Sequence, residues 1–334
     1  MLSPRSKKNW TNWHHQFHKQ FINDKEFIPN GANLLIAVSG GQDSMALMTL
    51  INDIKNQHDW GINVWHGNHQ WHKDSSTFAN ELENYCQTKR IPFYIDIANA
   101  AEITTEEKAR NWRYEKLCKK IDELLLKDNS MCKWFILTGH TSTDNTETFL
   151  LNLARGSNYS GLAGIPKKRI LNKKYILLRP ILIFDRKETN SICQVMKIPF
   201  WEDPTNLDLS IKRNLIRHKV LTYLEKIYPG CTNRINKFIG KMNKYSNEQA
   251  DLCSLAIKAC KNSGGFNREI LNSLGEEARN TIIHTLIKER CIKQISSENI
   301  ENICVEILNK NNGQINLSNG FKIIWNKNTL RFEN

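Results

Sequence analysis

Residues 34–50 read LLIAVSGGQDSMALMTL, an apolar run that leads through a glycine pair into a segment with helical spacing. The run Leu34–Val38 predicts a buried strand, and a helix is expected from about Ser44 to Ile54. Between them lie Ser39, Gly40, Gly41, Gln42, Asp43 and Ser44. Glycines here let backbone N–H groups approach an anion without obstruction by a Cβ, and the helix start adds its positive dipole end. The turn therefore predicts a phosphate-binding loop, with a tight capped turn as the structural alternative.

Around this loop, short apolar runs alternate with longer segments of helical spacing. Further strands are predicted at Ile62–Trp65, Phe93–Ile97, Trp134–Thr138 and Tyr175–Ile183. This alternation is typical of an α/β fold, a twisted parallel sheet with helices on both faces. From Ile211 to about Asn309 the apolar spacing is mostly helical, and residues 314–332 predict small hairpins. We therefore expect a basic N-terminal extension (1–30), an α/β domain (31–208) and a mostly helical domain (209–334).

Charge and cysteine usage limit the class of protein. Lys and Arg number 47 against 34 Asp and Glu, a net charge of +13 in 334 residues. This excess suits a polyanionic partner, either nucleic acid or an anionic membrane surface. No apolar run approaches the ~20 residues of a membrane-spanning helix. The nine cysteines contain no CxxC pair, which argues against a zinc ribbon, an iron–sulfur site or a secreted disulfide framework and predicts a cytoplasmic or similar reducing compartment.

A second polar group follows the predicted strand Trp134–Thr138. Residues 139–148 read GHTSTDNTET. On a helix that begins near this point, Asp144 and Glu147 lie three residues apart on one face, with His140 in the preceding turn. Ligands of parallel α/β sheets collect at the carboxyl ends of the strands, so this group is expected to face the phosphate-binding loop. Helix capping is the structural alternative for Asp144.

Several of these stretches together resemble one known family. The loop SGGxDS is similar to the PP-loop of N-type ATP pyrophosphatases, which cleave ATP between its α and β phosphates and bind the pyrophosphate portion with this loop. Beyond the loop, motifs of the tRNA(Ile)-lysidine synthetases are matched by EEKARNWRY at 106–114, HTSTDNTET at 140–148, RP at 179–180, EDPTN at 202–206 and RNLIR at 213–217. Thr143 stands where Asp is usual and Asn145 where Gln is usual. The family's D-H-G or N-H-G turn is replaced by HGNHQWH at 66–72, in which His66 or His69 could be the motif histidine.

The resemblance implies a reaction and a set of site residues. ATP adenylates the wobble cytidine of isoleucine tRNA with anticodon CAU, and the side-chain amine of L-lysine then displaces AMP. The implied cofactors are ATP, bound by Ser39–Ser44, and Mg²⁺, bound by Asp43 and Asp144. The implied catalytic residues are Asp43, Arg113, His140, Asp144 and Glu147. Asp144 and Glu147 are also candidates to hold the lysine ammonium, and the sequence does not separate that role from metal binding.

The resemblance makes residues 31–208 the catalytic domain and residues 209–334 a tRNA-binding domain. Arg213 and Arg217 have the charge expected of an RNA backbone contact, with a solvated helix face as the alternative. If the protein forms an oligomer, we expect a homodimer. Two other functions stay open: a PP-loop tRNA sulfur-transferase, which usually needs a cysteine pair at a spacing not seen here, and a non-catalytic tRNA-binding protein, against which the intact loop argues.

Overall fold

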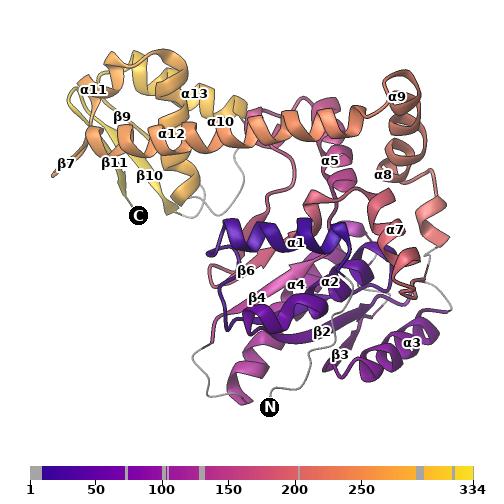
Figure 1. Cartoon of the computed structure of the whole chain (residues 1–334). Coiled ribbons are helices and arrows are strands. Elements are labelled where there is room, and N and C mark those ends of the chain that lie inside the picture. The colour runs from indigo at the N-terminus through magenta and orange to yellow at the C-terminus, as the bar shows by residue number, and fades with distance from the viewer. Residues whose placement is uncertain are drawn as a thin grey trace. The chain divides into compact units, whose positions relative to one another are not determined.

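The structure is a computed structural model that describes residues 10–71, 74–99, 103, 105–127, 132–201, 204–290, 297–317 and 320–333. The chain forms two compact units, Met1–Asn243 and Lys244–Asn334 (Figure 1). Of the expected basic extension of residues 1–30, residues 1–9 lie outside the described residues. The same holds for residues 202 and 203 of the EDPTN segment and for residue 72 of HGNHQWH.

The first unit is built on a six-stranded sheet. Its strands lie in the order β3-β2-β1-β4-β6-β5. They are β1 (Asn33–Ala37), β2 (Gly61–Asn68), β3 (Phe93–Ile97), β4 (Trp134–Thr138), β5 (Lys168–Leu171) and β6 (Tyr175–Leu178). All neighbouring pairs are parallel except β5 and β6, which are antiparallel. The expected α/β fold with a mostly parallel sheet is confirmed.

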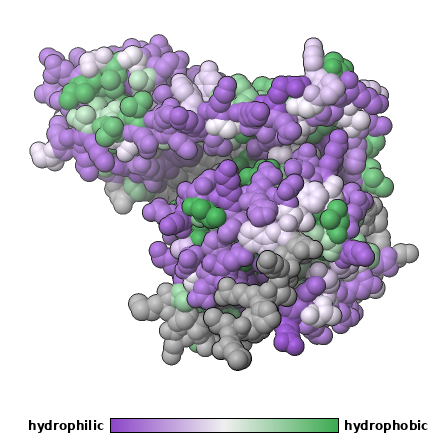
Figure 2. Space-filling model, in the orientation of Figure 1, coloured by the Kyte–Doolittle hydropathy of each residue, from purple (hydrophilic) through white to green (hydrophobic). Residues whose placement is uncertain are grey.

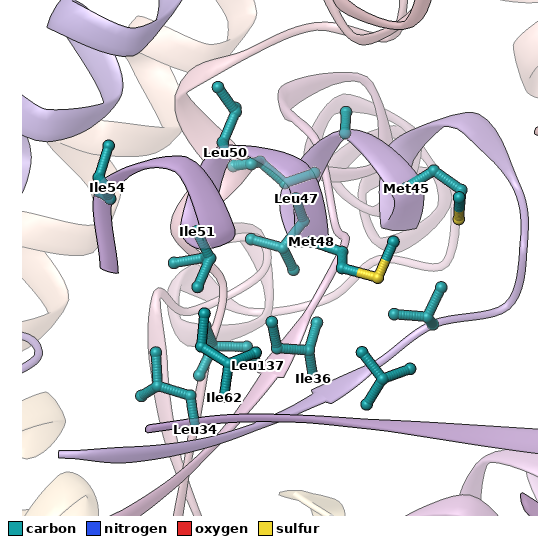
Figure 3. Packing of buried hydrophobic residues seen from close by; sticks show 14 of the residues in the cluster. Leu34, Ile36, Met45, Leu47, Met48, Leu50, Ile51, Ile54, Ile62 and Leu137 are labelled. Carbon is teal, nitrogen blue, oxygen red and sulfur yellow. The ribbon is translucent and has the colours of Figure 1, made fainter. Parts of the chain in front are cut away.

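Successive residues of the central strand β1 pack on opposite faces of the sheet, as the period of two requires. Leu34 and Ile36 join the larger core, which helix α2 (Gln42–His58) covers. Figure 3 shows side chains of α2 lying over these two strand residues. Leu35 points the other way, into a smaller core formed with helix α4 (Glu106–Lys127). Both faces are therefore covered, and burial of each such side chain contributes about 1.5–3 kcal/mol.

The remaining helices of this unit are α1 (Asn12–Asn23), α3 (Ser75–Thr88), α5 (Ser142–Ala154), α6 (Tyr159–Leu162), α7 (Arg186–Val195), α8 (Lys212–Leu215) and α9 (Leu221–Ile227), with the short turns η1 (Pro180–Ile183), η2 (Pro204–Leu207) and η3 (Ile216–Val220). Of these helices, α1 precedes the first strand, α3, α5 and α6 connect strands, and α7, α8 and α9 follow the last strand. Helix α1 is part of the core, because Phe17 and Phe21 are fully buried against the larger cluster. The described part of the expected extension is thus a packed helix.

The segment predicted as one strand, Tyr175–Ile183, is a strand followed by a 3₁₀ turn. Strand β6 ends at Leu178, and Pro180 begins η1 because proline has no N–H to donate to a sheet. Strand β5 was not predicted. It forms a hairpin with β6 through the three residues 172–174, of which Asn172 and Lys173 have positive φ angles of 47° and 56°.

Residues 209–243, which the sequence groups with the helical domain, belong to the first unit. The amide of Asn236 explains part of this placement, because it donates to the Ser142 carbonyl at 2.9 Å and to the Thr146 hydroxyl at 2.7 Å. Asn243 likewise donates to the Ala163 carbonyl at 2.8 Å. Helix α10 (Cys231–Cys260) spans the boundary between the two units.

The second unit, Lys244–Asn334, has its own core of helices on a small antiparallel sheet. The helices are α11 (Arg268–Ser273), α12 (Glu276–Arg290) and α13 (Ser297–Asn309). The sheet order is β7-β8-β11-β10-β9, with β7 (Lys261–Asn262), β8 (Gly265–Asn267), β9 (Gly313–Asn316), β10 (Lys322–Trp325) and β11 (Thr329–Glu333). The expected C-terminal hairpins are therefore part of a larger sheet, which β7 and β8 extend with strands too short to show alternation.

The visible surface is largely hydrophilic, with small separate apolar patches (Figure 2). Among the described residues, no helix has both the length and the apolar composition needed to span a bilayer.

Candidate active site

The loop Ser39–Ser44 joins β1 to α2 at the carboxyl edge of the sheet, as predicted. Gly40 has a φ of 90°, a conformation that favours glycine, and its carbonyl accepts the Trp201 amide at 3.0 Å. A Cβ on Gly40 would come within 2.9 Å of the Trp201 ring. The N-cap residue Gly41 offers no side-chain hydrogen bond to α2. The first N–H groups of this 17-residue helix are therefore available to an anion.

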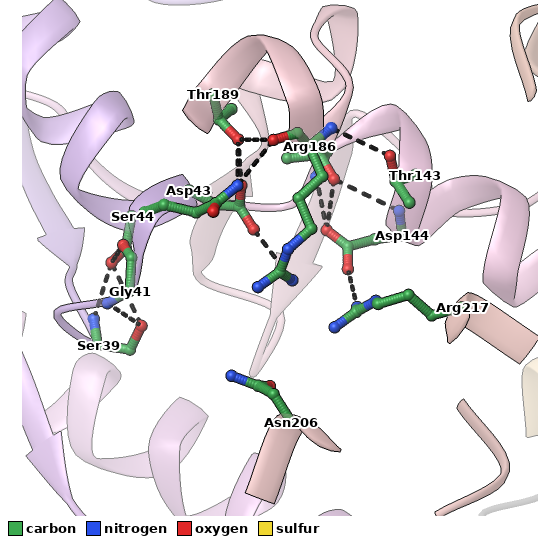
Figure 4. Close-up of polar contacts among 12 residues, drawn as sticks. Ser39, Gly41, Asp43, Ser44, Thr143, Asp144, Arg186, Thr189, Asn206 and Arg217 are labelled. Carbon is green, nitrogen blue, oxygen red and sulfur yellow. Dashed lines mark hydrogen bonds and ion pairs between the residues drawn. The ribbon is translucent and has the colours of Figure 1, made fainter. Parts of the chain in front are cut away.

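Helix α7 is joined to the start of α2 by hydrogen bonds. The Gln42 amide donates to the Arg186 carbonyl at 2.7 Å and to the Thr189 hydroxyl at 3.1 Å. The Thr189 hydroxyl donates to Oδ1 of Asp43 at 2.5 Å. The other oxygen of Asp43, Oδ2, lies 3.6 Å from a guanidinium nitrogen of Arg186. Gln42 is thus a positioning residue between the two helices, while Asp43 keeps one oxygen directed into the site (Figure 4).

Asp43 and Asp144 act on each other electrostatically. Burial raises the pKa of Asp43, and the carboxylate of Asp144 raises it further, while Arg186 and the hydrogen bond from Thr189 oppose the shift. The loop and the second polar group are also close in space, because a Cβ on Gly139 would lie 3.0 Å from the backbone of Ser44.

Asp144 is both a helix cap and a member of the site. Its Oδ2 accepts from the Thr141 amide at 2.7 Å and from the Thr141 hydroxyl at 2.9 Å, which closes a capping box at the start of α5. Its Oδ1 lies 3.0 Å from Arg213 and 3.3 Å from Arg217. Burial alone would raise the pKa of Asp144, but the two arginines, His140 and the Thr141 amide together lower it. Asp144 is therefore ionised in the folded protein.

Glu147 lies one turn further along α5 and has no exposed side-chain surface. Arg213 donates to Oε2 at 2.7 Å, and Arg217 donates to Oε1 at 2.5 Å and to Oε2 at 3.0 Å. Both guanidinium groups thus bridge Asp144 and Glu147. The two arginines predicted as RNA contacts therefore form ion pairs with the predicted site residues Asp144 and Glu147.

His140 lies at the end of β4, where its Nδ1 is 3.0 Å from the Thr138 hydroxyl. Burial lowers its pKa to about 3, with the opposing effect of Asp144 and the lowering effect of the charges of Arg179, Arg213 and Arg113 included. The imidazole is therefore neutral at physiological pH. The three guanidinium groups that act on it make this end of the site electropositive, which suits a phosphate-bearing substrate.

The two candidate histidines, His66 within β2 and His69 directly after it, have different surroundings. Gln70 has a φ of 54°, the conformation that glycine adopts most readily, and Asn68 accepts the Gln70 amide at 2.9 Å. This turn favours His69, in Asn68-His69-Gln70, as the motif histidine. His69 lies 3.4 Å from Arg113, and its pKa falls to about 4 through burial and the arginine charge. His66 instead contacts the Val38 carbonyl at 2.8 Å.

The two departures from the family motif have structural partners. Thr143 accepts the Arg186 amide through its hydroxyl at 3.1 Å. Asn145 accepts the Ile165 amide at 2.6 Å and donates to Asn236 at 2.9 Å. The sequence missed Arg186, Thr189, Trp201 and Asn236, because each lies on an element remote in sequence from the motif that it contacts. For Arg186 alone, the sequence gave a local sign of its position: it directly follows Asp185, the N-cap residue of α7.

The chain is similar in sequence to known proteins over most of its length. The family model of the PP-loop domain matches residues 11–224. The chain is 55% identical over 328 residues to tRNA(Ile)-lysidine synthase of Prochlorococcus marinus subsp. pastoris, covering 98% of both chains. It is 38% identical over 333 residues to tRNA(Ile)-lysidine synthase of Prochlorococcus marinus strain SARG, covering 99% of both.

Among solved structures, a U34-tRNA thiolase from Methanococcus maripaludis, which carries a [4Fe-4S] cluster, is similar with a TM-score of 0.54. The sequence identity is 14%, and the match covers 69% of this chain and 80% of the thiolase, so it shows a shared fold. The extent and identity of the sequence matches show more: the chain belongs to the PP-loop ATP-binding family and, within it, to the tRNA(Ile)-lysidine synthases.

Proposed function

We propose that this protein ligates L-lysine to the wobble cytidine of isoleucine tRNA with anticodon CAU, through an adenylated cytidine formed from ATP. The observation that carries the proposal is the meeting of two groups at one edge of the sheet. The start of helix α2, which follows the loop Ser39–Ser44, offers its first N–H groups to phosphates, and His140, Asp144 and Glu147 follow the neighbouring strand. The family membership supplies the substrate class.

The first step creates a leaving group. An amine does not expel the O2 oxygen of a pyrimidine directly. In the proposed step, O2 of the cytidine attacks the α phosphorus of ATP, an O–P bond forms, and the bond to pyrophosphate breaks. The N–H groups at the start of α2 stabilise the departing negative charge.

Magnesium fits the carboxylates at this site. Mg²⁺ prefers oxygen ligands and is commonly held by one or two carboxylates together with substrate phosphates. Asp43 and Asp144 form such a pair, and the raised pKa of Asp43 reflects burial and carboxylate repulsion that a cation would relieve. A bound Mg²⁺ would offset charge on the pyrophosphate. We assign Asp43 and Asp144 as its ligands.

In the second step the ε-amine of lysine attacks C2 of the adenylated cytidine. A C–N bond forms, the C2–O bond breaks, AMP leaves with the oxygen, and the amine nitrogen loses a proton. His140 is neutral at physiological pH and can hydrogen-bond the substrate without adding positive charge. Arg113 lies at the same electropositive end of the site and is suited to the phosphate of AMP.

The geometry favours different roles for the two carboxylates that could hold lysine. Arg213 and Arg217 hold both carboxylates, but Glu147 has no exposed side-chain surface. Asp144 keeps 13% of its side-chain surface exposed. This difference agrees with the assignment of Asp144 to the metal, and we assign Glu147 to positioning the two arginines.

Two buried thiols, Cys193 and Cys86, do not favour the alternative of sulfur transfer. Burial raises the pKa of Cys193, next to the loop, to about 12, and that of Cys86 also to about 12. The reactive form of cysteine is the thiolate, so these two groups are poor nucleophiles. Within the described part of the chain, no three His, Cys, Asp or Glu side chains are grouped to hold a metal ion.

Incorporation of labelled lysine tests the proposal. The protein is incubated with ATP, Mg²⁺ and an isoleucine tRNA transcript bearing CAU, beside a methionine tRNA with the same anticodon. We expect label in the isoleucine tRNA alone, with release of AMP and pyrophosphate. Absence of label from both would contradict the proposal, and sulfur transfer or non-catalytic tRNA binding would then be tested.

Two further properties belong to the proposal. A cytoplasmic location follows from tRNA as the substrate. A homodimer is tested by light scattering after gel filtration, where a mass near 38.8 kDa would instead indicate a monomer.

A further inference from the structure

Arg186 is a cation in the active site whose donors are mostly unused. It is the first residue of α7, and its backbone is fixed because its N–H donates to Thr143 at 3.1 Å and its carbonyl accepts from Gln42 at 2.7 Å. Its side chain extends from α7 into the space between Asp43 and Asp144 (Figure 4). A structural arginine would be expected to bind carbonyl groups or a close carboxylate with several of its donors, as Arg217 does with Glu147.

The contacts of the Arg186 guanidinium are few. Among the described residues, its one ion pair is with Asp43 at 3.6 Å, beyond hydrogen-bond distance, and its guanidinium makes no hydrogen bond. The side chain keeps 32% of its surface exposed, so solvent or a ligand can reach it. A guanidinium presents five donors in a planar fork that matches phosphate oxygens. The free donors lie beside the start of α2, the helix end that offers its N–H groups to phosphates.

We propose that Arg186 binds the β and γ phosphates of ATP and the pyrophosphate that leaves. This inference rests on the proposed adenylation and adds to it a binding residue outside the PP-loop. In the free protein the guanidinium lies beside Asp43. When ATP binds, the guanidinium contacts the phosphates, and Asp43 is released to act as a metal ligand.

The position of Arg186 sets which part of ATP it contacts. The loop Ser39–Ser44 and the start of α2 bind the pyrophosphate portion under the proposed function, and Arg186 lies beside Asp43 in the first turn of that helix. Arg113, Arg179 and Arg213 act instead on His140, at the end of the neighbouring strand β4. Arg186 should therefore contribute to pyrophosphate affinity and little to AMP affinity.

Ligand binding to the full-length protein tests this assignment. Dissociation constants for pyrophosphate and for AMP, each with Mg²⁺, are measured by calorimetry for the wild type, Arg186→Gln and Arg186→Lys. The control is Lys187→Gln, which removes the same charge from the next position of α7, where the side chain is exposed. A single charge-assisted phosphate contact predicts pyrophosphate binding about 10- to 100-fold weaker in Arg186→Gln. AMP binding should be unchanged, and Arg186→Lys should recover part of the loss.

Two results would overturn the assignment. Pyrophosphate affinity in Arg186→Gln equal to that of the wild type and of Lys187→Gln would show that the guanidinium does not contact the phosphates. An equal loss of pyrophosphate and AMP affinity would show that Arg186 only supports the structure of the site. Failure of the proposed function is seen separately, because the wild type would then release no pyrophosphate from ATP in the presence of tRNA.

Discussion

Glu147 shows how a single buried carboxylate can organise this site. It has no exposed side-chain surface, and its charge is compensated by Arg213 and Arg217 from a different segment of the chain. Removal of one partner of such a network leaves a buried charge that is incompletely paired. The free energy of unfolding then falls by more than the intact pair contributes to it. These two arginines therefore link residues 209–243 to helix α5.

The first prediction concerns the role of Arg217. If it pairs Glu147, Arg217→Ala should lower the free energy of unfolding by about 2 kcal/mol, because Arg213 still offsets part of the charge. In a Glu147→Gln background the same change should cost clearly less, and urea denaturation of the four proteins measures this coupling. If Arg217 were instead an RNA backbone contact, stability would not change and the salt dependence of tRNA binding would become shallower.

The second prediction concerns Gly139, at the end of β4. A Cβ at this position would lie 3.0 Å from the Cα and N atoms of Ser44 and 3.1 Å from the carbonyl carbon of Asp43. These are backbone atoms of the phosphate-binding loop and the start of α2, so Gly139→Ala must displace them. We expect kcat for ATP-dependent lysine attachment to fall on the order of 10- to 100-fold.

The control for Gly139 is Gly240→Ala on helix α10, where a Cβ meets no atom within 4 Å. This variant should keep full activity. If kcat is equal in Gly139→Ala and the wild type, the loop tolerates displacement. That result would contradict the prediction that the position of the loop backbone is important for activity.

Among the secondary-structure elements, the junction of α9 and α10 depends on one carboxylate. Glu225 accepts from the Gly230 amide at 2.7 Å, from the Thr232 amide at 2.8 Å and from the Thr232 hydroxyl at 2.5 Å. Burial acts to raise its pKa, but these hydrogen bonds outweigh burial and lower the pKa to about 2. Glu225 thus caps the N-terminus of the long helix α10 from outside the helix.

The third prediction is the pH dependence of this cap. Because the folded pKa is below the ordinary value of 4.5, its stabilisation is complete above pH 4.5 and is lost as the pH falls toward 2. Glu225→Gln should lower stability by about 1 kcal/mol at pH 7, a value limited by solvent screening, and by less at pH 3. Urea denaturation at both pH values measures the difference, with Glu248→Gln as an exposed control. An equal loss at both pH values would contradict the cap.

The sequence predicted those elements well whose strand, turn and helix signals lie next to one another in the chain. The loop at Ser39–Ser44 and the helix with Asp144 and Glu147 were both expected, because strand, turn and helix signals adjoin one another there. Strand β5 was missed because its four residues, mostly exposed, show no clear alternation. Arg186 and Trp201 were missed as site residues for a different reason. Their contacts depend on how α7 and the following segment pack against α2, which no short stretch of sequence encodes.

At the scale of the whole molecule, the positive charge is unevenly distributed. Residues 244–334 contain 12 Lys and Arg against 10 Asp and Glu, whereas residues 1–243 contain 35 against 24. The excess that suits a polyanionic partner therefore belongs to the first unit, which also holds the site. This distribution supports tRNA binding by the first unit close to the site of chemistry.

The fourth prediction is a steep salt dependence of tRNA binding. Release of counterions from about four neutralised phosphates would weaken binding on the order of 100-fold between 0.1 and 0.4 M KCl. Filter binding of isoleucine tRNA over this range measures the slope. A flat response would mean that charge contributes little to the complex, against the argument from composition.

The central claim is that the cytidine oxygen leaves with AMP, and isotope transfer tests it most directly. An isoleucine tRNA carrying ¹⁸O at O2 of the wobble cytidine is converted with ATP and lysine, and the products are analysed by mass spectrometry. The account predicts one ¹⁸O atom in the AMP phosphate and none in pyrophosphate. Product RNA that carries lysine beside unlabelled AMP, with the ¹⁸O retained in the RNA or released to water, would contradict it.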